Sequence, residues 1–217
     1  FGGLGLRIVS GGALGAVAGL AAWRGFPWYD LLVGLAAVLA FAEWRRLTGG
    51  WRRPGWLLGG LVYLGLPVVA LLWLRHDAQW GMATILWLFA SVAAIDTGAY
   101  FAGKGIGGPK LAPLISPNKT WAGLAGGAAA AGACGLIAAI ILGTDIVAAV
   151  AFSVILAPVA QIGDIGESAV KRYFGVKDSG SILPGHGGIL DRIDGLLAAA
   201  VFVAAVRLLG GGAAPWH

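Results

Sequence analysis

The sequence predicts an all-α, polytopic integral membrane protein with about seven transmembrane helices. Of its 217 residues, 59% are hydrophobic and 12% are charged, whereas a soluble domain is nearer half apolar and a quarter charged. The apolar residues gather into seven runs, most of which approach the ~20 residues that a helix needs to cross a bilayer. The basic residues collect in alternate connections between these runs, a pattern typical of cytoplasmic loops.

The seven runs set the positions of the expected helices. The first run is short and follows Arg7, so a cleavable signal peptide is the alternative to a true span. We favour a span because Gly11, Gly15 and Gly19 repeat every four residues, and this spacing lets another helix pack closely in lipid. The fifth run begins with a similar stripe. The runs cover residues 8–23, 28–44, 56–74, 80–102, 121–142, 146–163 and 193–209.

The distribution of basic residues predicts the orientation in the membrane. Twelve of the fifteen lie before the first run or in every second connection, and three lie on the other side. The positive-inside rule makes the rich side cytoplasmic. We therefore expect a multi-pass protein of the cell inner (cytoplasmic) membrane, with cytoplasmic loops at 45–55, 103–119 and 165–191. The net charge of +5 follows from this topology and does not indicate nucleic-acid binding.

Residues 161–195 carry five of the ten acidic residues between two apolar runs. Charges this dense beside apolar helices are costly unless they hold something charged in return. Asp164 and Glu167 are three residues apart at the end of one run. Asp191 and Asp194 repeat that spacing at the start of the next, so a helix puts each pair on one face. Two facing pairs would make an oxygen-rich pocket suited to a hard divalent cation such as Mg2+.

The same segment also carries groups suited to phosphate. Glycine lets backbone N–H groups approach a phosphate closely, and basic side chains lie between the acids. Acids for a metal, with glycines and bases for phosphate, together indicate a nucleotide. An ordinary cytoplasmic loop with capping acids and solvated bases is the alternative. The glycines are Gly175, Gly180, Gly185, Gly187 and Gly188, and the bases are Lys171, Arg172, Lys177 and Arg192.

Residues 96–123 form the second informative region, in which glycines and prolines separate the fourth run from the fifth. Asp96 lies near the predicted cytoplasmic end of the fourth span, and an intramembrane Asp indicates either function or a hydrogen bond between helices. Ser116 or Asn118 is expected to cap the fifth helix. A helix N-terminus beside Lys119 is suited to phosphate, with pure capping as the alternative.

Two ordered sets of residues carry a resemblance to a known family. The first set is Ser168-x-x-Lys171-Arg172, Lys177-Asp178-Ser179-Gly180 and Pro184-Gly185-His186-Gly187-Gly188-Ile189-Leu190-Asp191-Arg192-Ile193-Asp194. The second is Asp96-Thr97-Gly98-Ala99-Tyr100, Gly103-Lys104, Lys110-Leu111-Ala112-Pro113 and Ser116-Pro117-Asn118-Lys119-Thr120-Trp121, and Glu43-Trp44 also fits. In this order they resemble the signature of the phosphatidate cytidylyltransferase (CDP-diacylglycerol synthase) family.

The resemblance implies a nucleotidyltransferase that transfers CMP from CTP to phosphatidate in phospholipid biosynthesis. The attacking phosphomonoester is largely ionised near neutral pH, because its second pKa is about 6, so no general base is needed. Repulsion between two anions is the main obstacle, and metal ions and bases relieve it. We expect Mg2+ as the cofactor, as one ion or as two ions of which one could be monovalent. The expected partners are CTP, phosphatidate and the lipid bilayer, without nucleic acid and with a homodimer left open.

These expectations assign roles to particular residues. A single membrane-embedded cytidylyltransferase domain would cover 1–217, with N-terminal helices in 1–95 and the catalytic part, with its cytoplasmic active-site loops, in 96–217. The expected metal ligands are Asp164, Asp191, Glu167 and Asp194. The expected catalytic residues are Asp164, Asp191, Lys171, Arg172, Lys177 and Asp194. The expected substrate-binding residues are Ser116, Lys119, His186, Gly187, Gly188, Arg192 and Asp96.

Two other classes of function remain as alternatives. A cation or proton transporter would use Asp96, Asp164 and Asp191 as a relay and would move ions without nucleotide. Another lipid enzyme is the second alternative, such as a CTP-using polyprenol kinase or an alcohol phosphotransferase. The last of these needs an acid array of the D-G-x-x-A-R type, which the sequence lacks.

Overall fold

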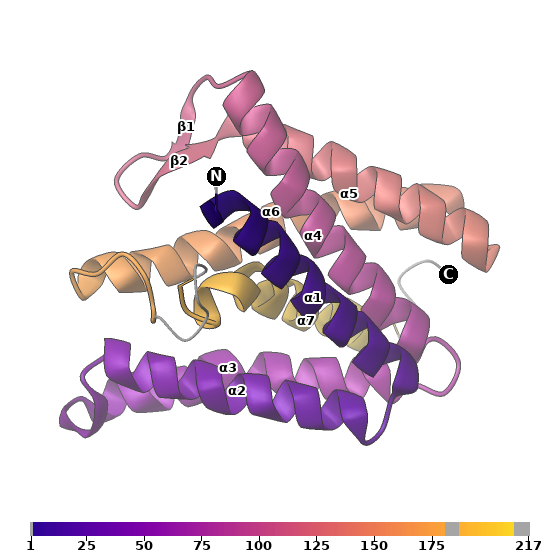
Figure 1. The fold of residues 1–217 in the computed structure, drawn as a ribbon. Coiled ribbons are helices and arrows are strands. Elements are labelled where there is room, and N and C mark those ends of the chain that lie inside the picture. The colour runs from indigo at the N-terminus through magenta and orange to yellow at the C-terminus, as the bar shows by residue number, and fades with distance from the viewer. Residues whose placement is uncertain (1, 181–186, 211–217) are drawn as a thin grey trace. The chain divides into compact units, whose positions relative to one another are not determined.

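The computed structural model describes residues 2–180 and 187–210, with side chains described from residue 11 onward. Over this part of the chain the protein is mostly helical, with seven α-helices, one short 3-10 helix and one two-stranded sheet. The predicted helices are confirmed, and the small sheet is an addition to the all-α prediction. In chain order the elements are α1 (Gly2–Arg24), α2 (Trp28–Leu47), the 3-10 helix η1 (Gly50–Arg52), α3 (Pro54–Arg75), α4 (Gly81–Gly105), β1 (Lys110–Ala112), β2 (Ser116–Thr120), α5 (Trp121–Leu142), α6 (Ile146–Tyr173) and α7 (Leu190–Leu209) (Figure 1).

Four of the described helices, α3, α4, α5 and α6, are long and apolar enough to cross a membrane. They correspond to four of the seven predicted spans, and they make the chain a multi-pass membrane protein by helix length and composition. That α1, α2 and α7 also cross stays a prediction. Helix α6 continues beyond the predicted end of its apolar run at residue 163, as far as Tyr173. The acids Asp164 and Glu167 therefore lie within this helix and not at its end.

The connection before α5 is a β-hairpin, in which β1 pairs antiparallel with β2. Proline favours extended backbone in the residue before it, so Pro117 favours a strand at Ser116 over a helix start. Thr120 is the N-cap of α5, because it has extended backbone (φ −125°, ψ 157°) and its side chain accepts a hydrogen bond from Gly123 N at 3.0 Å. The prediction that Ser116 or Asn118 caps this helix is therefore wrong.

The chain packs as two compact units, each assembled from two separate segments. The first unit contains Phe1–Leu86 and Lys171–Ile193, and the second contains Trp87–Val170 and Asp194–His217. The boundaries fall within α4, α6 and α7. The predicted division into residues 1–95 and 96–217 of a single domain stays a prediction.

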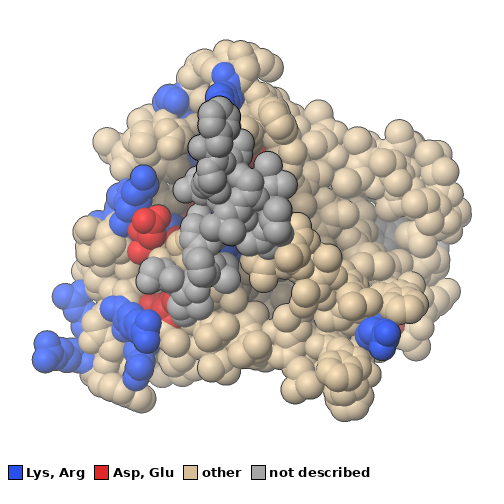
Figure 2. All heavy atoms as spheres, in the orientation of Figure 1, with Lys and Arg blue, Asp and Glu red and all other residues tan. Residues whose placement is uncertain are grey.

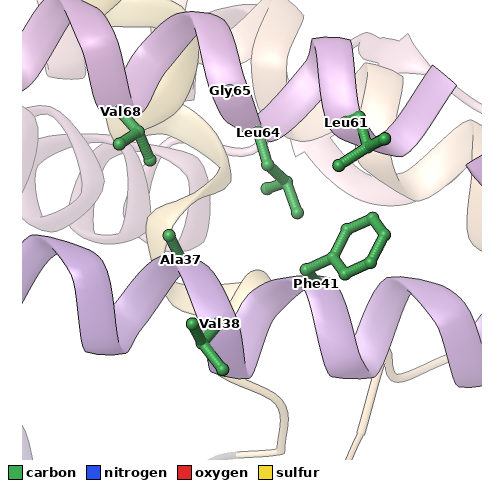
Figure 3. Close-up of a pocket in the computed structure, with 7 residues that line it drawn as sticks. All are labelled: Ala37, Val38, Phe41, Leu61, Leu64, Gly65 and Val68. Carbon is green, nitrogen blue, oxygen red and sulfur yellow. The ribbon is translucent and has the colours of Figure 1, made fainter. Parts of the chain in front are cut away.

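Helices α2 and α3 lie side by side in the first unit (Figure 1). At one end, Trp44 Nε1 donates to Trp56 O at 2.7 Å. Glycine is needed at position 60, because a Cβ there would lie 2.3 Å from the Trp44 ring. Between the two helices is a cavity of about 310 Å3 whose lining carries no polar side chain (Figure 3). Its lining residues are Ala37, Val38, Phe41, Leu61, Leu64, Gly65 and Val68.

Glycines bring the helices of the second unit into close contact. A Cβ at Gly127 would lie 2.9 Å from Ile95 O, and one at Gly126 would lie 2.3 Å from Ala102 Cβ, so α5 packs closely on α4. The predicted role of the small-residue stripe in α5 is thereby confirmed. In α1, by contrast, a Cβ at Gly15 or Gly19 would meet nothing within 4 Å in the described part of the chain.

Candidate active site

Asp191, in the first turn of α7, accepts hydrogen bonds at both carboxylate oxygens. Lys171 Nζ donates to Oδ1 at 2.6 Å, and Gly188 N donates to Oδ2 at 2.9 Å. Ser179 N adds a further bond to Oδ2 at 3.1 Å. Burial would raise the pKa of this carboxyl, but the bonds from Lys171, Gly188 and Ser179, with the Lys171 charge, hold its pKa below the usual value. Asp191 is thus a carboxylate at neutral pH.

Lys171 is a buried ammonium whose side chain is 9% exposed, and that of Asp191 is 13% exposed. This ion pair joins the end of α6 to the start of α7 within the first unit. The predicted bases near it differ in environment. Arg172 is exposed and its Nη1 donates to Val176 O at 2.8 Å, while Lys177 and Arg192 are also exposed.

Lys119, on β2, makes the corresponding contact in the second unit. Its Nζ donates to Gln161 Oε1 at 2.7 Å and forms a short ion pair with Asp164. Ser168 Oγ donates to the other oxygen of Asp164 at 3.3 Å. The hairpin therefore places Lys119 against Asp164, which the sequence predicts as a metal ligand.

Four carboxylates gather near α7 in the second unit. Asp194 is acted on electrostatically by Asp164, Glu167 and Asp96, all of the same charge. Gly163 makes this approach possible, because a Cβ there would lie 2.8 Å from Asp194 O. Glu167 is 1% exposed and Asp194 Oδ1 accepts from Gly195 N at 2.7 Å. Like charges so close repel one another, and a cation bound among them would relieve that repulsion.

The donor chemistry of this group fits a hard divalent cation, because every donor is a carboxylate oxygen. Among the residues that the structure describes, however, no three His, Cys, Asp or Glu side chains are arranged to hold an ion. At two of the predicted ligands, Asp164 and Asp191, a lysine ammonium lies against the carboxylate instead. Asp191 belongs to the first unit and the other three acids to the second, so the sharing of one ion by all four stays a prediction.

Basic side chains gather at the η1 end of the α2–α3 pair. Figure 2 shows Lys and Arg atoms grouped over this end, next to Asp or Glu atoms. Trp51, in η1, is 80% exposed. Arg53 stacks over the Phe174 ring at 5.1 Å from its centroid. The exposed bases at this end are Arg45, Arg46, Arg52 and Arg53.

The structure groups most of the predicted site residues in two places. In the first unit, Asp191, Lys171 and Gly188 are in direct contact. The Gly188 N–H that we predicted for phosphate donates to Asp191, so its role toward phosphate stays a prediction. In the second unit, Lys119 and Asp164 are in contact, and Ser116 begins the same strand as Lys119. The predicted His186 lies outside the described residues.

Three residues without a predicted role take part in these contacts: Glu43, Gln161 and Ser179. Glu43 accepts from Ser179, Ile189 and Leu190, with bonds at both oxygens. A signal was available for it, because Glu43 lies in the last part of α2, where the helix dipole disfavours an acid. Gln161 lies near the end of an apolar run and Ser179 lies in a glycine-rich segment, and neither position distinguishes the residue from an ordinary polar one.

Comparison with known proteins places these residues in a family context. Residues 51–209 match the model described as "Cytidylyltransferase family". The chain is 48% identical over 178 residues to the phosphatidate cytidylyltransferase of Brucella suis, covering 79% of this chain and 62% of that protein. It is 35% identical over 203 residues to that of Rickettsia prowazekii, covering 90% and 88%. It is 39% identical over 151 residues to that of Bacillus subtilis, covering 69% and 56%. The chain therefore spans about three fifths of the Brucella protein's length.

Proposed function

Because the chain belongs to the phosphatidate cytidylyltransferase family, we propose that it transfers CMP from CTP to phosphatidate, giving CDP-diacylglycerol and pyrophosphate. A phosphate-monoester oxygen of phosphatidate attacks the α-phosphorus of CTP. A new P–O bond forms while the bond to the β-phosphate oxygen breaks, and pyrophosphate leaves. The attacking oxygen is already ionised near neutral pH, because its second pKa is about 6, so no protein group has to remove a proton.

The observation that supports this reaction is a lysine–carboxylate pair in each unit. Lys171 is held on Asp191, and Lys119 is held on Asp164. Two anions must approach each other in the reaction, and fixed cations lower the electrostatic cost of that approach. Both lysines also fall in the segments that carry the family resemblance. We assign phosphate or nucleotide binding to the remaining predicted residues Ser116, Arg172, Lys177, His186, Gly187, Gly188, Arg192 and Asp96.

A divalent cation, Mg2+ by its preference for carboxylate oxygen, completes the proposal. Asp164, Glu167 and Asp194 would hold it, with Asp191 as a further ligand. When bound, such a cation neutralises charge on the reacting phosphates. The nearness of three other acids to Asp194 supports this assignment, because a bound cation would relieve the repulsion among them.

A direct assay tests the reaction. Purified protein is supplied with labelled CTP, phosphatidate and Mg2+, and the lipid fraction is scored for labelled nucleotide. We expect a lipid-linked cytidine nucleotide and an equal yield of pyrophosphate. Label transferred to a polyprenol instead of phosphatidate would favour a kinase of that class. Ion flux in vesicles without nucleotide, and no labelled lipid, would favour a transporter.

Lys119→Ala is expected to weaken CTP binding more than it slows turnover. A lysine that holds a CTP phosphate equally in the ground and transition states affects mainly the apparent KM for CTP, which we expect to rise by about tenfold. Initial rates against CTP concentration measure this. Lys110→Ala is the matched control, because it removes an exposed lysine from the other strand of the same hairpin. An unchanged KM in Lys119→Ala would contradict the assignment.

We also propose that the hairpin faces the cytoplasm, as the twelve-to-three distribution of bases indicates. In a Cys134→Ala background, a cysteine at Leu114, which is 95% exposed, should react with a membrane-impermeant thiol reagent only after the cells are opened. A cysteine at Gln79, in the exposed α3–α4 connection, should react in intact cells. The reverse pattern would overturn the proposed orientation.

A further inference from the structure

Glu43, near the end of α2, is a buried carboxylate to which the assignments above give no role. It is 1% exposed. Its Oε1 accepts from Ile189 N at 3.0 Å, and its Oε2 accepts from Leu190 N at 3.0 Å. Ser179 Oγ also donates to Oε2 at 3.3 Å. A buried carboxylate is costly without such partners, and acceptance at both oxygens is the pattern of an ionised group.

These bonds fix the first turn of α7 from outside the helix. The first N–H groups of a helix have no partner within it, and an anion at that end is favoured by the helix dipole. Glu43 accepts from the N–H of Leu190, the first residue of α7, and from that of Ile189 just before the helix. Asp191, within the first turn, accepts from the N–H of Gly188, which also precedes the helix. Ser179 links the two, because its N–H donates to Asp191 and its hydroxyl to Glu43.

The packing around Glu43 leaves no room for a ligand. A Cβ at Gly180 would lie 2.5 Å from Glu43 Oε1, and one at Gly188 would lie 2.6 Å from Oε2 and 2.1 Å from Ser179 Oγ. The backbone at both glycines therefore rests directly on the carboxylate. Glu43 cannot touch a substrate in this arrangement, and any effect on the reaction must pass through the segment that it holds.

We propose that Glu43 is a positioning residue, which sets the place of Asp191 by anchoring the start of α7 and the Ser179–Gly180 backbone. This inference rests on the proposed function, because Asp191 matters only if it acts in the reaction. It explains why an acid stands at the C-terminal end of α2, a place that disfavours it locally. It also explains the presence of glycine at positions 180 and 188.

Glu43→Gln tests the proposal, because it keeps the size of the side chain but replaces one accepting oxygen by an NH2 donor. Whichever oxygen is replaced, the new donor faces the N–H of Ile189 or Leu190. We expect hydrogen exchange over residues 187–193 to be faster than in the wild-type protein. We expect kcat to fall by about tenfold with little change in the KM for CTP, and the Mg2+ concentration for half-maximal rate to rise by about threefold or more. Loss of folded protein alone would not change that Mg2+ requirement.

Gly180→Ala provides a second route to the same displacement and leaves the Glu43 charge in place. Its added Cβ would push on Glu43 Oε1, so the same changes in exchange, kcat and Mg2+ requirement are expected. Thr48→Val is the matched control. Thr48 is fully buried in the C-cap position of α2, and its hydroxyl donates to Trp44 O of the same helix at 2.9 Å.

The outcomes separate the two levels of the argument. Unchanged exchange over 187–193 in both variants would overturn the anchoring. Faster exchange with a normal kcat and a normal Mg2+ requirement would overturn the positioning role. If the wild-type protein forms no lipid-linked nucleotide, the proposed function fails, and the positioning role fails with it whatever the exchange shows.

Discussion

Asp191→Asn is expected to lower turnover by a factor of about a hundred or more, equivalent to about 2.7 kcal/mol or more of lost transition-state stabilisation. The substitution keeps the size of the side chain but removes the charge that a bound cation and Lys171 both require. If the charge acts mainly in the transition state, kcat falls while substrate binding survives. Initial rates against CTP concentration, together with binding of phosphatidate, measure the two effects separately.

The same substitution also has a structural effect that must be separated from catalysis. Asp191 accepts bonds at both oxygens, so the amide of an Asn would turn an NH2 toward a donor in either orientation. It would also leave the buried Lys171 without its counter-ion, and breaking a buried pair can cost about 3–5 kcal/mol. Thermal unfolding of the variant should therefore be recorded, and rates compared only below its transition.

A control for Asp191→Asn is available in the α5–α6 connection. Asp145 caps α6 through its Oδ1, which accepts from Ala148 N at 2.7 Å. Asp145→Asn keeps this acceptor and should turn over at the wild-type rate. Near-normal turnover in Asp191→Asn, at a temperature where that variant is folded, would contradict the catalytic role that we assign to Asp191 within residues 161–195.

The helices could be predicted because the apolar residues form continuous runs whose lengths match the thickness of a bilayer. Their ends could not, because helix propensity and tertiary contacts outweigh hydropathy there. Helix α6 continues through charged residues to Tyr173, where a hydropathy pattern ends at residue 163. The hairpin was missed for a similar reason. Its strands are short, and the residue that caps α5 is Thr120, close to two other candidates of similar propensity, Ser116 and Asn118.

Part of the candidate site could be predicted from the sequence, because charged residues within an apolar sequence are energetically costly and therefore indicate a function. Asp164, Lys171 and Asp191 could be predicted for this reason, and they lie in direct ion pairs. Which base pairs with which acid could not be predicted, because Lys119 and Asp164 are 45 positions apart. The role of Glu43 could not be predicted either, because it is 147 positions from Leu190. Such partners are set by packing, and a single sequence does not encode them in its local spacing.

Removal of divalent cations with EDTA is expected to abolish turnover while the protein stays folded. Turnover should stop because lysines alone would have to neutralise two reacting phosphate groups. The fold should persist because Lys119 and Lys171 lie against Asp164 and Asp191 in the described structure, so these acids keep a cationic partner when no metal is bound.

Two measurements test this expectation, namely the initial rate in EDTA and in excess Mg2+, and thermal unfolding under both conditions. Mg2+ should restore the rate fully. The chelated protein should unfold cooperatively, at a stability lower by no more than the ~2.7 kcal/mol that a ligand at a hundredfold its Kd contributes. Full turnover in EDTA would refute the metal assignment. Unfolding by EDTA would show instead that the acids depend on a metal for structure, against the pairing with Lys119 and Lys171.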